Sequence, residues 1–476
     1  MSIPAPGQYS RVVHWFRRDL RLRDNTALHH AARSGRELVP VYITSDWSAG
    51  HLWTGAPRQD FLCGCLHALA QSVDELGGRL IIRRGKADVA LRELLTETRA
   101  EALFLNRDPD PFGRGTEHRL EKLCRELGIA IHSYKDTVLN EAPEILTNAG
   151  DPYRVYTPYS RKWLAKDKDP PLPAPSRLAT PSGLSSDPLP TLDTWGLPAH
   201  DVTLPEPGEG AARKRLRTAL RDRLARYQSR RDLPAVEGTS RLSQDLRFGT
   251  LSVRTIHQSV HKAMADAPPT VRPQFETYLK ELAWREFYMQ LLHHFPHVLE
   301  HEFNERYRGL PWDEPGKRFE AWKTGTTGFP IVDAGMRELA ATGFMHNRVR
   351  MITAMFLTKD LHLDWRLGEQ FFMQSLVDGE IASNNGGWQW SAGTGADAAP
   401  YFRIQNPWSQ TKRYDPKGDY IRKWVPELAE VPAKALFTAP DDGSSVALGY
   451  PAPIVDHATE RNKTLAIFKR HLAEGR

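Results

Sequence analysis

The sequence predicts two domains, an N-terminal α/β domain with a doubly wound parallel sheet and an all-α C-terminal domain. Three observations predict this arrangement. In residues 1–140, short β-rich runs alternate with amphipathic helical patterns. Residues 141–210 read as a connector, which from residue 166 onward is rich in Pro, Ser, Gly and Asp. In residues 211–476 the apolar positions repeat at helical spacing, and β-rich runs are nearly absent.

Five runs rich in β-branched and aromatic residues predict the strands of the sheet. They are Val12–Phe16, Val39–Thr44, Arg79–Arg83, Ala102–Asn106 and Ile129–Tyr134. Helical spacing between them predicts three helices, Phe61–Leu76, Val89–Arg99 and Thr116–Leu127. Regular alternation of this kind favours parallel strands joined by helices. No GxGxxG motif follows the first strand, so the sequence does not indicate an ordinary dinucleotide-binding site there.

The C-terminal half consists mainly of predicted helices, because its apolar residues recur every three to four positions. The strongest segments are Ala211–Gln228, Val253–Ala265, Gln274–His294, Val332–Ala340, His346–Leu361, Leu367–Leu376 and, at the end, Ala458–Glu474.

Composition places the chain among soluble globular proteins. Of its 476 residues, 40% are hydrophobic and 26% are charged, and no stretch reaches the ~20 apolar residues that span a bilayer. The N-terminus lacks the basic start and apolar run of a signal peptide. Three cysteines, Cys63, Cys65 and Cys124, lack CxxC spacing, which argues against a disulfide framework and a metal site. We therefore expect a cytoplasmic protein.

Positive charge is concentrated in one segment. The net charge is +6, and residues 211–231 carry nine Arg or Lys residues against one acid, Asp222. Such a run alone is more often a solvated helix face. The alternative is that it binds a polyanion, which further basic residues beside aromatic ones later in the chain favour.

Tryptophans gather in the helical half. Eight of the thirteen lie between Trp284 and Trp424, with the densest spot in the segment DGEIASNNGGWQW, residues 378–390. Because tryptophan is easily oxidised, the cluster suggests ring stacking or electron transfer. The polar groups around it need partners, which a polar aromatic ligand would supply. The alternative is a Trp-rich helical core with an Asn-Gly turn.

Two further segments are candidate binding elements. Hydroxyls and backbone amides in Val236–Ser243 suit a phosphate at the start of a helix, although Ser240 or Ser243 could simply cap that helix. The segment HNRVRM, residues 346–351, is followed by Lys359–Trp365, and its basic residues alone would more often form a solvated helix face.

One helical face in the segment 281–288 has an unusual composition. Glu281, Trp284, Arg285 and Tyr288 fall at positions i, i+3, i+4 and i+7 and therefore share that face. A core face would not hold Glu and Arg beside Trp. The pattern favours a stripe that faces a site.

Six motifs, in this order along the chain, resemble those of one family. They are WFRRDLRLRDN (15–25), EGTSRLS (237–243), WREF (284–287), HNRVRM (346–351), DGEIASNNGGWQW (378–390) and APYFRIQNP (399–407). The chain resembles the DNA photolyase/cryptochrome family, and most closely the class I photolyases that repair cyclobutane pyrimidine dimers. The resemblance covers nearly the whole chain. It implies an α/β antenna domain, a connector, and a helical domain that binds FAD and DNA.

The resemblance also implies a function. In such photolyases, photoexcited reduced FAD transfers an electron to a dimer that is flipped out of the DNA, which makes the protein a carbon–carbon lyase. The alternative is a cryptochrome-type blue-light photoreceptor, which usually has a long extension after the last helix. We expect UV-damaged DNA, duplex or single-stranded, as the partner of a monomer that associates with the nucleoid when bound. A second chromophore, methenyltetrahydrofolate or 8-hydroxy-deazaflavin, stays open, because Leu105–Arg114 matches neither binding pattern.

The family's flavin contacts fall on positions that are present in this chain. The resemblance assigns FAD binding to Tyr227, Thr239, Ser240, Arg241, Leu242, Ser243, Tyr278, Arg350, Asp378, Gly379, Glu380 and Asn384. Asn384 stands where the family faces flavin N5, and its amide can donate or accept there. Cryptochromes tend to place an acid or cysteine at this position, so Asn384 favours repair. Tyr278 and Lys280 depart from the tryptophan and asparagine that are frequent in relatives.

The lesion side follows from the same resemblance. Glu281, Asn347, Met351 and Asn384 are the expected catalytic residues, and Trp284 and Trp390 are expected to stack on the flipped-out lesion. Photolyases for the (6-4) lesion have histidine at the Met351 position. Expected DNA contacts are Arg231, Glu281, Trp284, Arg285, Tyr288, Asn347, Arg348, Trp390, Arg403 and Gln410. The family's chain of electron-carrying tryptophans corresponds to Trp388, Trp365 and Trp312.

Overall fold

The structure is a computed structural model that describes residues 3–47 and 50–474. Its N-terminal domain contains a five-stranded sheet in the order β3-β2-β1-β4-β5, in which all neighbouring strands are parallel. The strands are β1 (Tyr9–Phe16), β2 (Gly35–Thr44), β3 (Ile81–Arg84), β4 (Ala102–Asn106) and β5 (Ala130–Tyr134). The predicted doubly wound sheet is confirmed. Strands β2 and β3 are added on one side of β1, and the chain then crosses to the other side of β1, where it forms β4 and β5.

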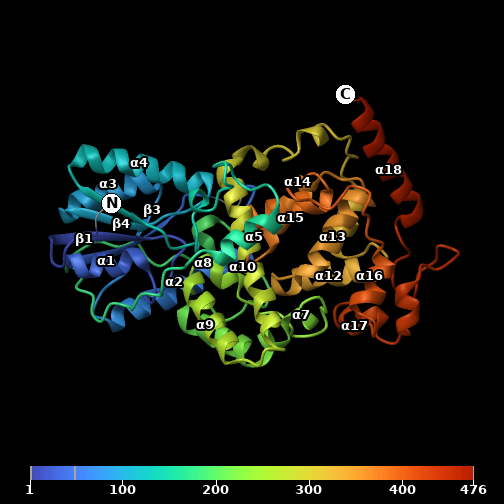
Figure 1. Cartoon of the computed structure of the whole chain (residues 1–476), viewed down its shortest axis with the longest axis horizontal. Coiled ribbons are helices and arrows are strands. Elements are labelled where there is room, and N and C mark those ends of the chain that lie inside the picture. The colour runs from blue at the N-terminus through green and yellow to red at the C-terminus, as the bar shows by residue number, and fades with distance from the viewer. Residues whose placement is uncertain (1–2, 48–49, 475–476) are drawn as a thin grey trace.

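Helices cover both faces of this sheet (Figure 1). They are α1 (Thr26–Ser34), α2 (Ala56–Glu75), α3 (Ala87–Thr98) and α4 (Pro111–Leu127). Successive residues of β1 point to opposite faces, so Val12 packs with α1 and α2 whereas Val13 packs with α3 and α4. Helix α1 was not predicted, because its nine residues include two histidines and give only a short apolar stripe.

The connector contains one helix that the sequence analysis did not predict. Helix α5 (Tyr156–Ala165) packs against α10 (Arg272–His294) through its buried aromatic residues. The chain then runs along the α/β domain, where the amide of Leu38 donates to the carbonyl of Ala179 (2.9 Å). It finally reaches the helical domain, where the amide of Thr203 donates to the carbonyl of Ala341 (2.9 Å).

The helical domain is larger and lies at the other end of the molecule (Figure 1). Its longer helices are α6 (Glu209–Thr218), α9 (Val253–Asp266), α10, α11 (Lys317–Thr324), α12 (Pro330–Thr342), α13 (Asn347–Lys359), α14 (Trp365–Ser375), α15 (Ile381–Ala392), α16 (Pro407–Tyr414) and α18 (His457–Glu474). The short helices are α7 (Tyr227–Arg230), α8 (Ser243–Phe248) and α17 (Asp419–Trp424). Helix α15 contacts α10, α13 and α14. No helix in the described part of the chain is long and apolar enough to cross a membrane.

The predicted helix Ala211–Gln228 is not continuous. A π-helical turn at Ala219–Arg223 and a 3-10 turn at Leu224–Arg226 separate α6 from α7. The buried positions explain this break, because Ala219 and Leu224 are five residues apart and a regular α-helix cannot place both on one face. The irregular turns bring Tyr227 inward, next to Tyr278 of α10.

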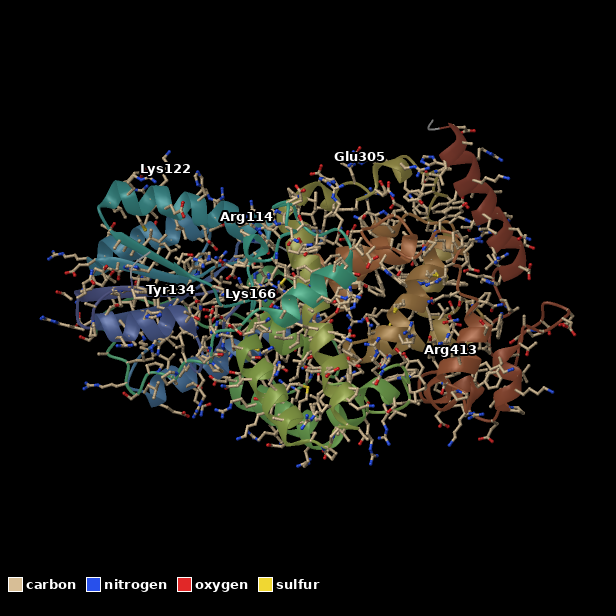
Figure 2. The ribbon with its side chains drawn as sticks, viewed as in Figure 1. Arg114, Lys122, Tyr134, Lys166, Glu305 and Arg413 are labelled. Atoms are coloured by element: carbon tan, nitrogen blue, oxygen red, sulfur yellow. The ribbon has the colours of Figure 1, made fainter. Side chains whose placement is uncertain are left out.

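Buried ion pairs join the two domains. Arg254 of α9 pairs with Asp24 (2.9 Å) and Asp136 (2.7 Å), which belong to the N-terminal part of the chain, and Arg21 also pairs with Asp136 (2.6 Å). At the edge of the joint, Arg114 of α4 donates to the carbonyl of His293 in α10 (2.9 Å). Figure 2 labels Arg114 where the two domains meet. Burial alone would raise the pKa of Asp136, but the two arginines lower it to about 2.

Replacing Arg254 with Ala should therefore destabilise the protein and reduce its sensitivity to acid. The change leaves two buried carboxylates short of a partner, which costs about 3–5 kcal/mol of the free energy of unfolding. Because the pKa of Asp136 is lowered by folding, its contribution is present at neutral pH and is lost as the pH falls from about 4 towards 2. Denaturant titrations at neutral and acid pH measure both effects.

Arg217→Ala on the exposed side of α6 is the matched control, with an expected change within about 0.5 kcal/mol. Equal stability of Arg254→Ala and Arg217→Ala at neutral pH would contradict the role assigned to this joint.

Candidate functional site

A cavity of about 490 Å³ opens in the helical domain between α7, α8, α10, α13 and α15. Its volume lies within the range of pockets that hold organic cofactors. It brings together most of the residues that the sequence analysis assigned to a site: Tyr227, Arg231, Ser240, Leu242, Ser243, Tyr278, Glu281, Trp284, Arg285, Tyr288, Asn347, Arg348, Arg350, Met351, Asp378, Gly379, Glu380, Asn384, Trp388 and Trp390. These residues come from segments up to 163 positions apart (227 to 390) and meet only in the folded chain.

Six predicted site residues do not line this cavity: Thr239, Arg241, Trp312, Trp365, Arg403 and Gln410. The carbonyl of Thr239 accepts a hydrogen bond from Arg223 (3.3 Å). The guanidinium of Arg241 lies over the ring of Phe344 (3.4 Å to the centroid). Arg403 is exposed, and Gln410 lies half-buried on α16.

The loop before α8 forms part of the cavity wall. Arg241 has a left-handed φ of 57°, and this turn places Ser240 and Leu242 on the cavity wall. The helix begins after Leu242, which has no side-chain acceptor for the first amides, so neither Ser240 nor Ser243 is the helix cap. Uncapped amides at the start of a helix suit an anionic group such as a phosphate.

Asp378 and Gly379 form another part of the wall. Arg350 of α13 pairs with Asp378 (2.9 Å), so its charge is balanced inside the protein. The carbonyl of Gly379 accepts a hydrogen bond from Arg247 (2.8 Å). A Cβ at Gly379 would lie only 2.7 Å from a guanidinium nitrogen of Arg58, so this position needs glycine unless Arg58 moves.

Glu380 connects the cavity to the α/β domain. Its carboxylate accepts from the amide of Ser383 (2.8 Å) and so caps α15. The same side chain pairs with Arg18, which follows β1 (3.5 Å). Although burial alone would raise the pKa of Glu380, Arg18 and the Ser383 amide hold it below its ordinary value. A negative charge at this position also interacts favourably with the N-terminal end of the helix dipole.

The paired asparagines of α15 have different surroundings. The amide nitrogen of Asn384 donates to the carbonyl of Glu369 (2.9 Å), which leaves its oxygen as the free acceptor on the cavity side. Asn385 is buried and donates to the carbonyl of Val298 (2.9 Å) and to the side chain of Glu369 (3.0 Å). Burial raises the pKa of Glu369 to about 7.

Trp388 is buried and lies between the cavity and α14. Its indole fits over Gly368, where a Cβ would lie 2.0 Å from the ring. Phe372 (5.0 Å between centroids) and Trp322 (6.0 Å) pack edge-on against it. Trp322 is a neighbour that the sequence analysis did not single out, although it belongs to the same Trp-rich region. Residues 381–392 are helical throughout, so they contain no Asn-Gly turn of the kind that the alternative interpretation included.

The other two tryptophans of the predicted series lead away from the cavity. Trp365 precedes Gly368 by three residues, so it shares the face of α14 that Trp388 contacts. The backbone amide of Asp313 donates to the carbonyl of His362 (2.8 Å), and Asp313 forms an isolated parallel β-bridge with Leu363. These contacts place Trp312 beside the chain that enters α14. Trp365 is buried whereas Trp312 is partly exposed. The contacts thus favour the order Trp388, Trp365, Trp312 from cavity to surface.

Glu281 and Arg231 form an ion pair on the cavity wall. Both were expected to contact DNA or the lesion, and in this structure they contact each other. Burial raises the pKa of Glu281, and the charge of Arg231 opposes that rise.

Trp284 has one of its faces covered. Its indole stacks on Tyr156 of α5, with centroids 3.6 Å apart and planes within 8°. The hydroxyl of Tyr156 donates to the carbonyl of Lys280 (2.6 Å), which fixes this ring. Trp284 also lines the cavity, so its opposite side can receive a further flat group. Tyr156 was missed because it lies in the predicted connector.

Two arginines expected to face DNA are engaged within the protein. Arg348 pairs with Asp232 (2.9 Å) and lies over the ring of Tyr414 (4.6 Å). Arg285 donates to the carbonyl of Thr137 (2.9 Å), and burial lowers its pKa. Arg285 also lines the cavity, so its contact with DNA stays a prediction.

Aromatic residues also gather at the carboxyl ends of the strands, beyond β2 and at the start of α4. Trp47 stacks on His51 (4.1 Å, 13°), and Trp53 packs edge-on against Phe112 (5.7 Å). Trp47 is 42% exposed and Phe112 47% exposed, so flat surfaces face solvent there. In open parallel sheets this edge is where ligands bind.

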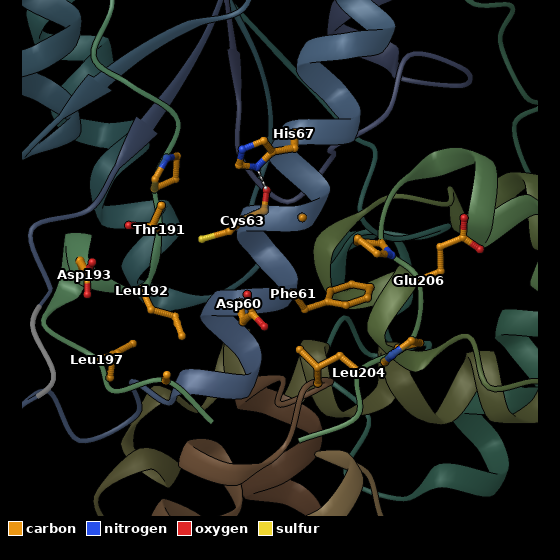
Figure 3. A pocket seen from close by; sticks show the side chains of 15 residues that line it. Asp60, Phe61, Cys63, His67, Thr191, Leu192, Asp193, Leu197, Leu204 and Glu206 are labelled. Carbon is orange, nitrogen blue, oxygen red and sulfur yellow. Dashed lines mark hydrogen bonds between the residues drawn. The ribbon is translucent and has the colours of Figure 1, made fainter. Parts of the chain in front are cut away.

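A second cavity of about 670 Å³ lies between α2 and residues 190–207 (Figure 3). Its lining includes three acids, Asp60, Asp193 and Glu206, next to apolar side chains. On the wall that α2 forms, His67 Nδ1 is hydrogen-bonded to the carbonyl of Cys63 in the same helix (2.8 Å; Figure 3). None of the predicted site residues lines it. The cavity in the helical domain is therefore the better candidate site.

Two protein-family models match the chain. The model described as DNA photolyase matches residues 12–176, and the model described as the FAD-binding domain of DNA photolyase matches residues 278–470. The second match includes most of α10 and all of α13 and α15, which form much of the cavity wall.

Characterised relatives are similar over nearly their whole length. A deoxyribodipyrimidine photo-lyase of Halobacterium salinarum is 40% identical, with 96% of this chain and 98% of that protein covered. One of Agrobacterium fabrum is 41% identical, with 96% and 97% covered.

Solved structures have the same architecture. A class III photolyase of Agrobacterium tumefaciens superimposes with a TM-score of 0.89 at 39% identity, covering 99% of this chain and 98% of that one. An archaeal photolyase of Sulfolobus tokodaii with two FAD molecules gives 0.84 at 30% identity, covering 97% and 100%. A Synechocystis cryptochrome gives 0.86 at 29% identity, covering 98% and 100%.

Proposed function

The chain belongs to the DNA photolyase family, and we propose that it is an FAD-dependent enzyme that uses light to split cyclobutane pyrimidine dimers in DNA. One observation carries this proposal. A single cavity joins Glu281, Trp284, Asn347 and Met351, the expected lesion contacts, to the wall that carries Asn384. A lesion and a flavin can therefore occupy adjoining parts of one space.

The residues of the cavity fit FAD. The uncapped amides at the start of α8 suit its phosphates, and the Asn384 oxygen offers an acceptor on the wall where the family faces flavin N5. Arg350 and Asp378 compensate each other there, so a neutral ring system meets no isolated charge. When bound, FAD supplies the light-driven electron donor for dimer splitting.

The part of the cavity that contains Trp284 can bind a base that is flipped out of the duplex. Trp284 is held rigid by Tyr156 and offers its remaining face, and base stacking on such a ring is worth about 1–3 kcal/mol. Glu281 is positioned by Arg231 on the cavity wall, where its carboxyl group can make a hydrogen bond to the dimer. Trp390 and Asn347 complete the proposed contacts.

We further propose UV-damaged DNA as the partner, bound by a monomer in the cytoplasm. Arg348, exposed Arg403 and the basic run at 211–231 supply positive charge for phosphates, which positions DNA without reading its sequence. Four arginines of that run already pair with acids of the protein: Arg215 with Asp245, Arg221 with Asp222, Arg223 with Glu237 and Arg231 with Glu281.

The aromatic cluster of Trp47, His51, Trp53 and Phe112 is our proposed position for a second chromophore. Its partly exposed rings can stack on a flat molecule at the carboxyl edge of the sheet. The Sulfolobus tokodaii photolyase, with two FAD molecules, supports a second chromophore in this fold.

A photoreceptor of the cryptochrome type is the second candidate, favoured by the similarity to the Synechocystis cryptochrome. Asn384 argues for repair, since cryptochromes tend to place an acid or cysteine there. A repair assay separates the two candidates, because a photoreceptor without repair activity leaves dimers intact.

Purified protein with reduced FAD should restore intact pyrimidines in UV-treated DNA under blue or near-UV light. Dimers are counted before and after illumination, in DNA that carries either cyclobutane dimers or (6-4) products. We expect loss of cyclobutane dimers only, because Met351 occupies the position where (6-4) photolyases have histidine. Equal repair in darkness, or repair of (6-4) products alone, would contradict the proposal.

Photoreduction and repair should depend on different residues. Trp388→Phe keeps an aromatic ring that is harder to oxidise, so light-driven reduction of the oxidised cofactor should slow severalfold. With chemically reduced FAD this variant should still split dimers. Glu281→Ala should do the reverse, with normal photoreduction and weaker repair, since one polar contact to the lesion is worth about 1–3 kcal/mol. If Trp388→Phe is photoreduced at the wild-type rate, the proposed tryptophan series is not the main route.

A further inference from the structure

Glu302 contacts the middle tryptophan of the series that leads from the cavity to the surface. We propose that Glu302 is the proton acceptor for Trp365, taking the indole N–H proton when Trp365 is oxidised and returning it when Trp365 is reduced again. This inference rests on the proposed function, because it needs a photoexcited oxidised flavin that withdraws an electron through Trp388.

The two side chains contact each other directly, and both are buried. Trp365 Nε1 donates to Glu302 Oε1 at 3.1 Å, and neither side chain is more than 4% exposed. A hydrogen bond to an ionised acceptor is about twice as strong as one between neutral groups. An indole that has lost an electron is far more acidic than a neutral one. The carboxylate is therefore in place to receive its proton without any movement of the chain.

The neighbouring tryptophans have no comparable acceptor. Trp388 Nε1 is buried and has no partner among residues 3–47 and 50–474. Trp322 Nε1 donates to the carbonyl of Thr353 (3.0 Å), which can accept a hydrogen bond but is too weak a base to take the proton. Proton loss coupled to oxidation is thus built into Trp365 and not into the tryptophan next to the cavity.

Arg366 is a further reason why Trp365, when oxidised, should lose its proton. Its guanidinium lies over the Trp365 ring (4.6 Å to the centroid), and a positive charge there disfavours a second positive charge on the indole. The same guanidinium lies 3.2 Å from Glu302 and 3.1 Å from Asp364, which holds both carboxylates in place beside the indole. The positive charge over the ring therefore favours a neutral Trp365 radical over a radical cation.

The proposed step balances in electrons and protons. Trp388, after giving one electron to the photoexcited oxidised flavin, is a radical cation. Trp365 gives one electron to it and transfers the Nε1 proton to Glu302, which leaves neutral Trp388, a neutral Trp365 radical and a carboxylic acid. When Trp312 donates its electron to Trp365, Glu302 returns the proton and the pair is restored.

The proton transfer from Trp365 to Glu302 makes electron transfer along the three tryptophans directional. Electron return from the flavin to the neutral Trp365 radical requires the proton to move back at the same time. The hole is therefore held one tryptophan away from the cavity until Trp312 and an external reductant fill it. Photoreduction of the cofactor becomes more efficient, while dimer splitting, which uses the reduced cofactor directly, does not involve Glu302.

The test compares Glu302→Gln with wild-type holoenzyme by transient absorption after a light pulse, in H₂O and D₂O. Glutamine keeps the shape and the hydrogen-bond acceptor but cannot take the proton. In the wild type we expect a neutral tryptophan radical whose formation is slower in D₂O. In Glu302→Gln we expect a radical cation instead, with neutral-radical formation slowed by roughly tenfold or more. Glu300→Gln, at an exposed carboxylate on the same turn, is the charge-matched control and should behave as wild type.

A second readout does not depend on any variant. Transient infrared spectra of the wild type should show a carboxylic acid C=O band that appears and decays with the Trp365 radical. Absence of this band, or an unchanged neutral radical in Glu302→Gln, would overturn the proposal. Dimer splitting by chemically reduced protein is measured in parallel and should be the same in Glu302→Gln and wild type. If wild-type protein splits no dimers, the proposed function fails, whereas the radical spectra still decide the role of Glu302.

Discussion

The ion pair between Arg18 and Glu380 is the contact on which the arrangement of the site depends. Arg18 follows the first strand of the sheet, where Asp108 (3.0 Å) and Asp110 (3.6 Å) also hold it, and Glu380 caps α15. A buried charge of this kind is stable only with its partners, so the two domains cannot separate without a large cost. The position of α15, and with it Asn384, Trp388 and Trp390, is thereby fixed relative to the sheet.

Because α15 packs closely against its neighbours, its position also determines where the other walls of the cavity lie. Helix α15 lies against α10, α13 and α14, and two glycines allow the contact: a Cβ at Gly386 would meet Tyr288 of α10 at 2.0 Å, and one at Gly368 of α14 would meet Trp388. The lesion contacts proposed on α10 and α13 therefore face the flavin contacts proposed on α15. One rigid helix serves both halves of the reaction, since it lines the cavity and starts the tryptophan series.

Local patterns predicted the strands and most helices, because period and residue type determine them directly. The residues that line the cavity were predicted from long motifs, because each motif resembles a whole motif of one family. The misses depend on contacts between distant segments. The break after Ala219 follows from which side chains are buried. The partner of Trp284, Tyr156, lies 128 positions away (284 − 156), and the partner of Trp365, Glu302, lies 63 positions away (365 − 302). Spacing along the chain carries no information on such pairs.

The most direct test of a flavin that repairs DNA by light is the action spectrum of dimer splitting. Protein reconstituted with FAD alone and reduced beforehand is illuminated at a series of wavelengths, and dimers split per incident photon are counted. If the cavity holds the cofactor that acts on the lesion, the rate follows the absorption of the bound reduced flavin across the series. A rate that does not change with wavelength, or that persists in protein without FAD, would contradict this account.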